Sequence, residues 1–293
     1  MRRVRSAALR IIVPVLTQTV GRLPYFGLAL FARGLARLLL VTNRKHRRLA
    51  LEHLRLAFQD ASEHELEMLV RGCFLNAALN VAETLQLLAR GHRAFDHRLA
   101  VEGAENLERE RGKRLLVLCC HSGFWEVLGI AGARQEMPFF GFGRRPDDPV
   151  FADIVTRVRK AVKGKNIERG TVEGRRRLRQ ALKGDGGLVM LIDQDTKVDG
   201  TWVPFFGRPA YTPVGAAEMA LKHKMSVVPA FCERRGGGQH VVRFLPALEL
   251  PEDPTAATAV MTSATEAHIR RNPAQWVWWH RRWRRQPEAS EDA

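Results

Sequence analysis

The segment His121-Ser122-Gly123-Phe124-Trp125-Glu126 places a base and a carboxylic acid, the two groups of a proton-transfer pair, five residues apart. On an ideal helix, side chains at this spacing point about 140° away from each other. The pair can meet only if His121 lies in a turn and Glu126 lies in the first turn of a following helix. The Glu126 carboxylate would then accept a hydrogen bond from the Nδ1–H of His121, leaving Nε2 free to deprotonate a substrate hydroxyl. A surface pair or a helix-capping pair would have the same spacing.

The elements that must position this pair follow from the hydrophobic pattern. The apolar run 115–120 directly precedes His121 and is typical of a buried strand. The predicted strands are 115–120, 138–142, 188–192, 227–231 and 241–248, and the predicted helices lie near 124–133, 149–163, 172–183, 213–223 and 255–271. This alternation predicts an α/β fold with a mostly parallel central sheet flanked by helices. Catalytic and binding groups are then expected in the loops at the strand ends.

The first ~100 residues are predicted to be helical. Residues 1–42 contain two uncharged runs, 11–21 and 23–32, bordered by arginines. Neither run reaches the roughly 18 to 20 residues that span a bilayer. We expect an N-terminal membrane-associated helical segment lying in the cytoplasmic interface. A single tilted span and a soluble helix pair covering the core are the alternatives.

The rest of the chain is predicted to form one large domain, 43–286, which begins with a helical lead-in, 43–100. Within the lead-in, Ser62 and Glu65 have the spacing of a capping box. Thr212 and Pro213 are expected to be the N-cap and first residue of another helix. The last residues, 287–293, are expected to be a frayed tail.

Composition limits the classes of partner. The chain of 293 residues contains 47 lysines and arginines against 31 acidic residues, a net charge of +16, which calls for an anionic partner such as nucleic acid, an acidic protein or anionic lipid. Its four cysteines lack the spacing of zinc ligands, so we expect no metal and a reducing compartment.

Four more side chains are candidate substrate-binding residues. Arg145 follows the glycine-containing strand 138–142, and Arg159 and Arg169 belong to a dense basic run. An arginine fork suits a phosphate group, although each could equally be a solvated side chain. Asp193 follows the strand 188–192 and could orient these arginines, hydrogen-bond a sugar, or have a purely structural role.

The segment 275–285 alternates tryptophan with arginine. Single-stranded nucleic acid could stack on such a surface, but the same composition is typical of a membrane-interface belt. The N-terminal segment favours the membrane interpretation. Phe205 and Phe206 could line an acyl tunnel or belong to the core.

Taken in order, these motifs resemble the lysophospholipid acyltransferase superfamily and, within it, the lipid A biosynthesis lauroyl or myristoyl acyltransferases. The resemblance spans residues ~40 to 285. It rests on the His-x4-Glu motif at His121 and Glu126, the Arg145-Pro146 step, the Arg159 and Arg169 neighbourhood, Asp193-Gln194-Asp195, Pro204-Phe205-Phe206-Gly207 with Thr212-Pro213, and Pro273 to Arg282.

The resemblance implies a glycerolipid acyltransferase-like fold and an O-acyltransferase that moves a fatty acyl chain from an acyl carrier protein or acyl-CoA thioester to a hydroxyl of an anionic glycolipid, a lipid A precursor. It implies His121 as general base with Glu126 as its partner, and Arg145, Arg159, Arg169 and Asp193 as substrate-binding residues. It implies no cofactor, no metal and no nucleic acid. The expected location is the cytoplasmic face of the cell inner membrane, among inner-membrane lipids, held peripherally or by a single N-terminal anchor.

Two other functions are compatible with the sequence. The acceptor could be a phosphatidylinositol mannoside or a lysophospholipid. In a different class, the chain could be a non-catalytic basic protein that binds membrane or nucleic acid, with a structural His121-Glu126 pair. Substituting His121 discriminates the classes, because only an enzyme would lose activity.

Overall fold

The N-terminal third of the chain is helical. The computed structural model describes residues 2–184, 186–285 and 287. The helices of this part are α1 (Arg2–Gln18), η1 (Val20–Arg22), α2 (Tyr25–Thr42), α3 (Arg44–Ala57), α4 (Glu63–Arg90) and η2 (Gly91–Phe95). The capping box predicted from Ser62 and Glu65 is present at the start of α4. Most of the predicted frayed tail, 287–293, lies outside the described residues.

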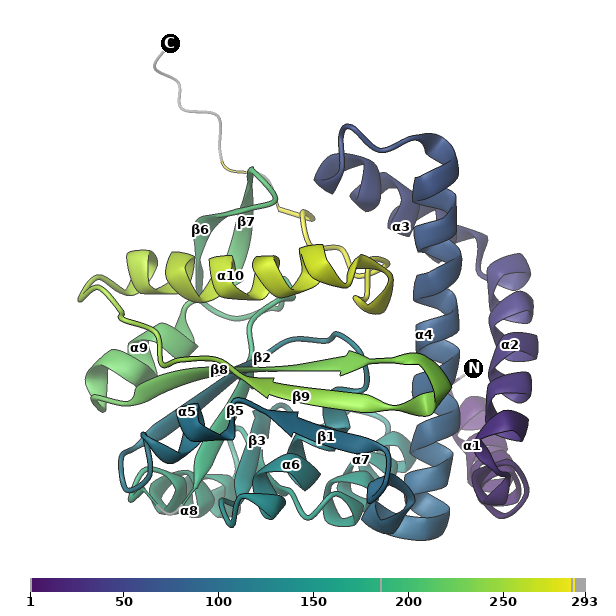
Figure 1. The fold of residues 1–293 in the computed structure, drawn as a ribbon, viewed down its shortest axis with the longest axis horizontal. Coiled ribbons are helices and arrows are strands. Elements are labelled where there is room, and N and C mark those ends of the chain that lie inside the picture. The colour runs from purple at the N-terminus through teal and green to yellow at the C-terminus, as the bar shows by residue number, and fades with distance from the viewer. Residues whose placement is uncertain (1, 185, 286, 288–293) are drawn as a thin grey trace.

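Helix α4 lies between α2 and the sheet (Figure 1). Helix α2 packs along it through Leu28, Ala32 and Ala36, small or aliphatic residues at helical spacing. Its 18 residues form one helix that is long and apolar enough to cross a membrane, although Arg33 and Arg37 interrupt its uncharged runs. Core helices of soluble proteins can meet the same criterion.

The remaining chain forms a sheet of seven strands in the order β1-β9-β8-β2-β5-β3-β4. All neighbouring pairs are parallel except β8 and β9. The strands are β1 (Leu99–Glu102), β2 (Leu115–Cys119), β3 (Phe139–Gly143), β4 (Lys165–Glu168), β5 (Gly187–Leu191), β8 (Ser226–Arg234) and β9 (His240–Phe244). The predicted α/β fold with a mostly parallel sheet is therefore confirmed.

Helices cover both faces of the sheet and fill in the connections. They are α5 (Ala104–Glu108), η3 (Trp125–Val127), α6 (Leu128–Arg134), α7 (Pro149–Ala161), α8 (Val172–Ala181), α9 (Gly215–Lys222), η4 (Gly236–Gly238), α10 (Pro254–Arg271) and η5 (Pro273–Gln275). Successive side chains of the buried strand β2 point to opposite faces of the sheet, so they belong to two different core clusters. Leu115 and Val117 pack with α6 and α7, whereas Leu116 and Leu118 pack with α8, α9 and α10.

Several elements differ from the sequence prediction. The short strands β1 and β4 were not predicted, and neither was the antiparallel hairpin of β6 (Gly200–Phe205) and β7 (Arg208–Pro213). The prediction that Thr212 and Pro213 begin a helix is wrong, because both residues end β7 and the helix starts at Gly215. Pairing with β6 takes precedence over the local capping signal.

Candidate active site

His121 lies at the carboxyl end of β2, next to the carboxyl end of β5, which carries Asp193. The Nδ1 atom of His121 is 2.9 Å from Oδ1 of Asp193, and the backbone N–H of His121 donates to Oδ2 at 3.0 Å. Because β2 and β5 are adjacent and parallel, two loops that are 72 residues apart in sequence meet at one edge of the sheet.

Asp193 is a buried carboxylate with several donors. Besides the two contacts with His121, the indole Nε1–H of Trp276 donates to Oδ2 at 2.8 Å. Burial alone would raise the pKa of Asp193, but the charge and hydrogen bonds of His121 and the hydrogen bond from Trp276 lower it to about 2. An ionised Asp193 requires a proton on Nδ1 of His121, so the neutral imidazole presents an unprotonated Nε2.

The imidazole of His121 is accessible to a substrate. Its side chain is 27% exposed, whereas that of Asp193 is fully buried. Its ring packs against the edge of Trp125, with ring centroids 5.1 Å apart. Within the described part of the chain, Nε2 has no hydrogen-bond partner. The pair can therefore act as a general base, because Asp193 orients the ring through Nδ1 and Nε2 remains accessible to a substrate.

The predicted pairing of His121 with Glu126 is not found. Glu126 lies in η3, as the spacing required, but its carboxylate faces Arg159, with Oε1 3.4 Å from the nearest guanidinium nitrogen. Asp193 occupies the position behind the imidazole that was expected for Glu126. The correction has a topological reason: Asp193 enters from the neighbouring strand and already contacts both nitrogen donors of His121.

Glu126 and Arg159 form a second, partly buried charged pair. Arg159 comes from α7, and its guanidinium packs over Gly141 of β3, where an added Cβ would lie 2.9 Å from a terminal nitrogen. Oε2 of Glu126 and Nε of Arg159 are buried without a hydrogen-bond partner among the described residues. Buried polar groups left unsatisfied in this way are costly and are often found at functional sites.

Arg145 and Arg169 are exposed on the loops that follow β3 and β4. The backbone N–H of Arg169 donates to the carbonyl of Gly143 at 2.9 Å, so the two loops are adjacent. Strand order places both at the same sheet edge as His121 and Asp193. Neither arginine makes an ion pair with another described residue of the site, so this edge offers two guanidinium groups to an anion.

The turn after His121 depends on a glycine. Gly123 has φ of +61°, and an added Cβ would lie 2.5 Å from the carbonyl oxygen of Cys232. Its backbone N–H donates to the carbonyl of Gln275, and its carbonyl accepts from the side-chain amide of Asn80 on α4. The turn after His121 is therefore held between α4 and the segment after α10.

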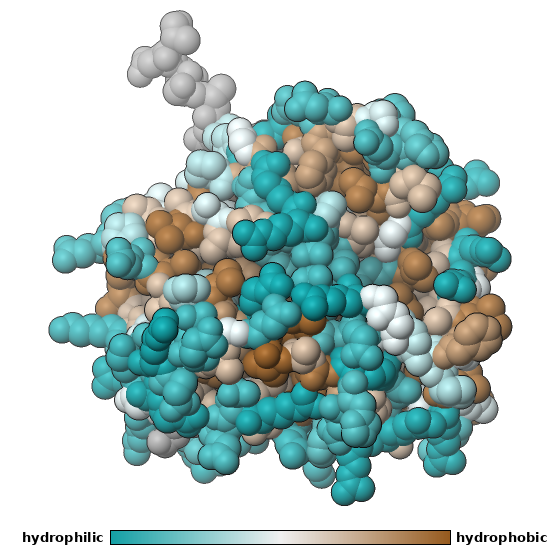
Figure 2. Space-filling model, viewed as in Figure 1, coloured by the Kyte–Doolittle hydropathy of each residue, from teal (hydrophilic) through white to brown (hydrophobic). Residues whose placement is uncertain are grey.

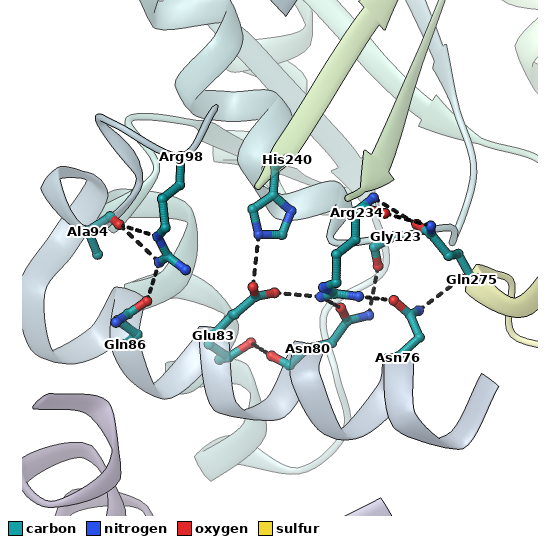
Figure 3. Close-up of polar contacts among 11 residues, drawn as sticks. Asn76, Asn80, Glu83, Gln86, Ala94, Arg98, Gly123, Arg234, His240 and Gln275 are labelled. Atoms are coloured by element: carbon teal, nitrogen blue, oxygen red, sulfur yellow. Dashed lines mark hydrogen bonds and ion pairs between the residues drawn. The ribbon is translucent and has the colours of Figure 1, made fainter. Parts of the chain in front are cut away.

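A buried polar network continues from this turn (Figure 3). Asn76, Asn80 and Glu83 point from α4 to the guanidinium of Arg234 on β8. The Nε2–H of His240 donates to Oε1 of Glu83 at 2.8 Å. Burial alone would raise the pKa of Glu83, but the charge and hydrogen bonds of Arg234 and His240 lower it to about 2. The network joins α4 to the sheet behind the active site.

The segment 275–285 forms the wall of the site rather than a membrane belt, so that prediction is wrong. Trp276, Trp278 and Arg282 are completely buried. Arg282 donates to the carbonyl of Tyr211 and to Oγ1 of Thr212, and burial lowers its pKa to about 10. Phe205 and Phe206 pack in the same aromatic cluster, so they belong to the core.

Trp276, which donates to Asp193, was not predicted to be part of the site. His280 lies on the same segment, and burial lowers the pKa of its imidazole to about 4. The one available signal was the spacing of Trp276 and Trp278. Two large apolar residues two positions apart indicate an extended segment with one buried side.

Comparison with known proteins identifies the family of the chain. The sequence profile of the bacterial lipid A biosynthesis acyltransferase family matches residues 2–285. The chain is 24% identical over 238 residues to a lipid A biosynthesis acyltransferase of Haemophilus influenzae, covering 80% of this chain and 74% of that protein. It is 25% identical over 275 residues to the lipid A biosynthesis lauroyltransferase of Escherichia coli K12, covering 92% and 89%.

A third relative has a different printed activity. The phosphatidylinositol mannoside acyltransferase of Mycobacterium tuberculosis is 25% identical over 203 residues, covering 66% of this chain and 63% of that protein. Each of the three relatives is an acyltransferase by name, and the profile match spans nearly the whole chain. The non-catalytic alternative is thereby set aside, and the chain is an acyltransferase that belongs to the bacterial lipid A biosynthesis acyltransferase family.

Proposed function

We propose that this enzyme transfers a fatty acyl chain from an acyl carrier protein or CoA thioester to a hydroxyl of a lipid A precursor. The observation that carries the proposal is the His121-Asp193 pair, 2.9 Å apart, at the carboxyl edge of the sheet. The family and the two lipid A relatives support the acceptor class. The donor is proposed from the chemistry of acyl transfer and from the basic surface, which suits an acidic carrier protein.

In the proposed mechanism His121 Nε2 takes the proton of the acceptor hydroxyl as the oxygen attacks the thioester carbonyl. The resulting imidazolium is stabilised by ionised Asp193, which stays deprotonated throughout. Collapse of the tetrahedral intermediate breaks the C–S bond, and the imidazolium returns the proton to the departing thiolate. No covalent acyl-enzyme is involved.

Glu126 and Arg159 have a different proposed role from the one the sequence suggested. Arg159 is held at the sheet edge by Glu126 and by packing over Gly141. From there its guanidinium would stabilise the oxyanion or bind an acceptor phosphate. Arg145 and Arg169, exposed on the adjoining loops, would bind phosphates of the acceptor.

Membrane association at the cytoplasmic face of the inner membrane is proposed from α1 and α2. Phe26, Leu30, Leu38 and Val41 of α2 are 59 to 77% exposed on the side away from α4. Such an apolar face is suited to acyl chains, and the neighbouring arginines to phosphates. Interfacial docking is favoured because α2 also packs along α4; a single anchor is the alternative. Membrane fractionation before and after a carbonate wash separates the two.

The test uses purified full-length protein with radiolabelled acyl carrier protein and CoA thioesters. The acceptors are a lipid A precursor, a lysophospholipid and a phosphatidylinositol mannoside, the last included because of the Mycobacterium tuberculosis relative. We expect labelling of the lipid A precursor and a loss of rate of about 10²- to 10⁴-fold in His121→Ala. His64→Ala, an exposed histidine on α4, is the matched control and should retain activity.

Each other outcome is informative. Labelling of the mannoside alone would transfer the proposal to that acceptor. Labelling that His121→Ala leaves intact would remove the general-base mechanism while keeping the transferase.

A further inference from the structure

A large groove lies between α2, α3 and α4, apart from the His121 site. Its volume is about 1100 Å³, and none of its lining residues belongs to the site described above. It lies on the side of the molecule that α2 and α3 form in Figure 1, and Figure 2 shows apolar and strongly hydrophilic side chains side by side over these helices. The proposed acyl transfer leaves this groove without a role.

The rim of the groove is strongly basic. Seven arginines and two glutamates line it. Three of the arginines are engaged in ion pairs with glutamates on α4. The other four, Arg33 and Arg37 of α2 and Arg44 and Arg48 of α3, are exposed and form no ion pair with any described residue. Four uncompensated guanidinium groups around one depression favour a bound anion with several acceptor oxygens.

The floor of the groove is apolar. It is formed by Ala36, Leu40, Val41, Leu51, Val70 and Leu75. Val41 also belongs to the exposed apolar face of α2, where its side chain is 67% exposed, so the floor continues into that face. The ligand should therefore have an anionic head and a hydrocarbon tail, and it should be able to enter from an apolar phase.

We propose that this groove binds one anionic phospholipid, with its phosphate on the free arginines and an acyl chain along the floor. Basic pockets between membrane-facing helices are suited to anionic headgroups. Free phosphate would leave the apolar floor in water, and an acidic carrier protein would match the rim but not the floor. Bound lipid would fix α2 and α3 against α4 at the membrane surface. The proposal concerns binding alone and does not depend on the transferase activity.

The test measures binding of dioctanoyl phosphatidylglycerol and dioctanoyl phosphatidylcholine to full-length protein in neutral detergent, by native mass spectrometry. The wild type should prefer phosphatidylglycerol. The variant Arg37→Glu/Arg48→Glu should bind phosphatidylglycerol more weakly, with a loss of affinity of at least about tenfold for each substitution, because each removes charge-assisted hydrogen bonds. The matched control, Arg175→Glu/Arg179→Glu on α8, makes the same change of charge at exposed positions outside the groove and should bind normally.

Val41→Asn tests the floor separately and should weaken binding of both lipids without changing the preference between them. If charge reversal impairs folding, as judged by circular dichroism, Arg37→Gln/Arg48→Gln replaces it. Equal losses in the groove and control variants would reduce the effect to overall charge and overturn the proposal. So would equal binding of the two lipids by the wild type, or a groove variant that binds phosphatidylglycerol as tightly as the wild type does.

Discussion

The carboxylate of Asp193 determines what the imidazole of His121 can do. Two nitrogens of His121 and the indole of Trp276 donate to it, and its pKa is about 2. Near neutral pH this anion is always present, so it holds the tautomer with a free Nε2 and would stabilise the imidazolium that the proposed mechanism forms. Neither effect requires a shift in the position of the ring.

Asp193→Asn should therefore inactivate the enzyme without unfolding it. The amide can donate to Nδ1, which favours the tautomer with a proton on Nε2, and that tautomer cannot accept a proton from the substrate. By analogy with the same substitution in a Ser-His-Asp triad, the expected loss of rate is about 10⁴-fold. The measurement is the acyl-transfer rate at saturating donor.

Asp199→Asn serves as the control, since Asp199 is exposed in the loop that leads into β6. Glu126→Gln separates the two carboxylates further: it should weaken the contact with Arg159 and leave the tautomer of His121 unchanged. If Glu126→Gln were the more damaging of the two, the assignment of Asp193 as the partner would be wrong.

At this scale the sequence predicted the side chains but not their pairing. His121 and Asp193 were identified because each follows an apolar run, Glu126 because of its spacing from His121, and Arg159 because it belongs to a dense basic run. The local spacing of His121 and Glu126 suggested a contact, yet the contact that forms joins residues 72 positions apart. Which strand lies beside β2 is decided by sheet order, and a hydrophobic pattern does not encode that order.

Helix α4 is the element that links the N-terminal helices to the sheet edge that carries His121. One side of it packs on α2, and the other side sends Asn76, Asn80 and Glu83 to Arg234 and to the turn after His121. Its apolar periodicity and capping box were enough to predict it. Its polar face could not be interpreted from the sequence, because the partners Arg234 and His240 lie on strands more than 150 residues away.

Glu83→Gln should destabilise the protein strongly. Removing one member of a buried ion pair leaves the other charge uncompensated, which costs about 3 to 5 kcal/mol. Glu102→Gln is the matched control, because Glu102 pairs with Arg235 and Arg243 at the surface, where such pairs contribute about 0 to 1 kcal/mol. The free energy of unfolding, from urea titration in detergent, should separate the two variants. Equal losses would show that the buried network does not hold α4 in place.

The elements missed by prediction share a physical cause. Strands β1 and β4 lie at the two edges of the sheet and have four residues each, too few to show a period. In the hairpin of β6 and β7, prolines at 204, 209 and 213 argue against strands. A two-stranded ribbon tolerates them because it consists entirely of edge strands.

Over the whole molecule, positive charge makes acidification costly. The chain carries +16 near neutrality, and each histidine that gains a proton adds to that repulsion. His268 is buried against Phe231, its Nε2 is 3.3 Å from Oγ of Ser122, and burial together with Arg243 and Arg271 lowers its pKa to about 4. The fold therefore keeps this imidazole neutral beside the turn that follows His121.

Stability should fall as the pH is lowered from about 6.5 to about 4. In that window the unfolded chain binds a proton at His268 and the folded protein does not, so the unfolded state is favoured by about 1.4 kcal/mol per pH unit. His280 acts in the same direction. Asp193 and Glu83 have pKa values of about 2 in the folded protein, whereas unfolded carboxyl groups titrate near pH 4. These two residues therefore add to the loss of stability only as the pH falls below about 4.

The slope of unfolding free energy against pH isolates the effect of His268 from lost packing. His268→Asn lowers stability at every pH, but it also removes the titrating group, so the slope between pH 6.5 and 4 should be shallower by about 1.4 kcal/mol per unit. His64→Asn should keep the wild-type slope, because the side chain of His64 is in water in both states. An unchanged slope in His268→Asn would mean that the folded protein already accepts a proton at this position, and the turn that carries Ser122 would then tolerate a charge behind it.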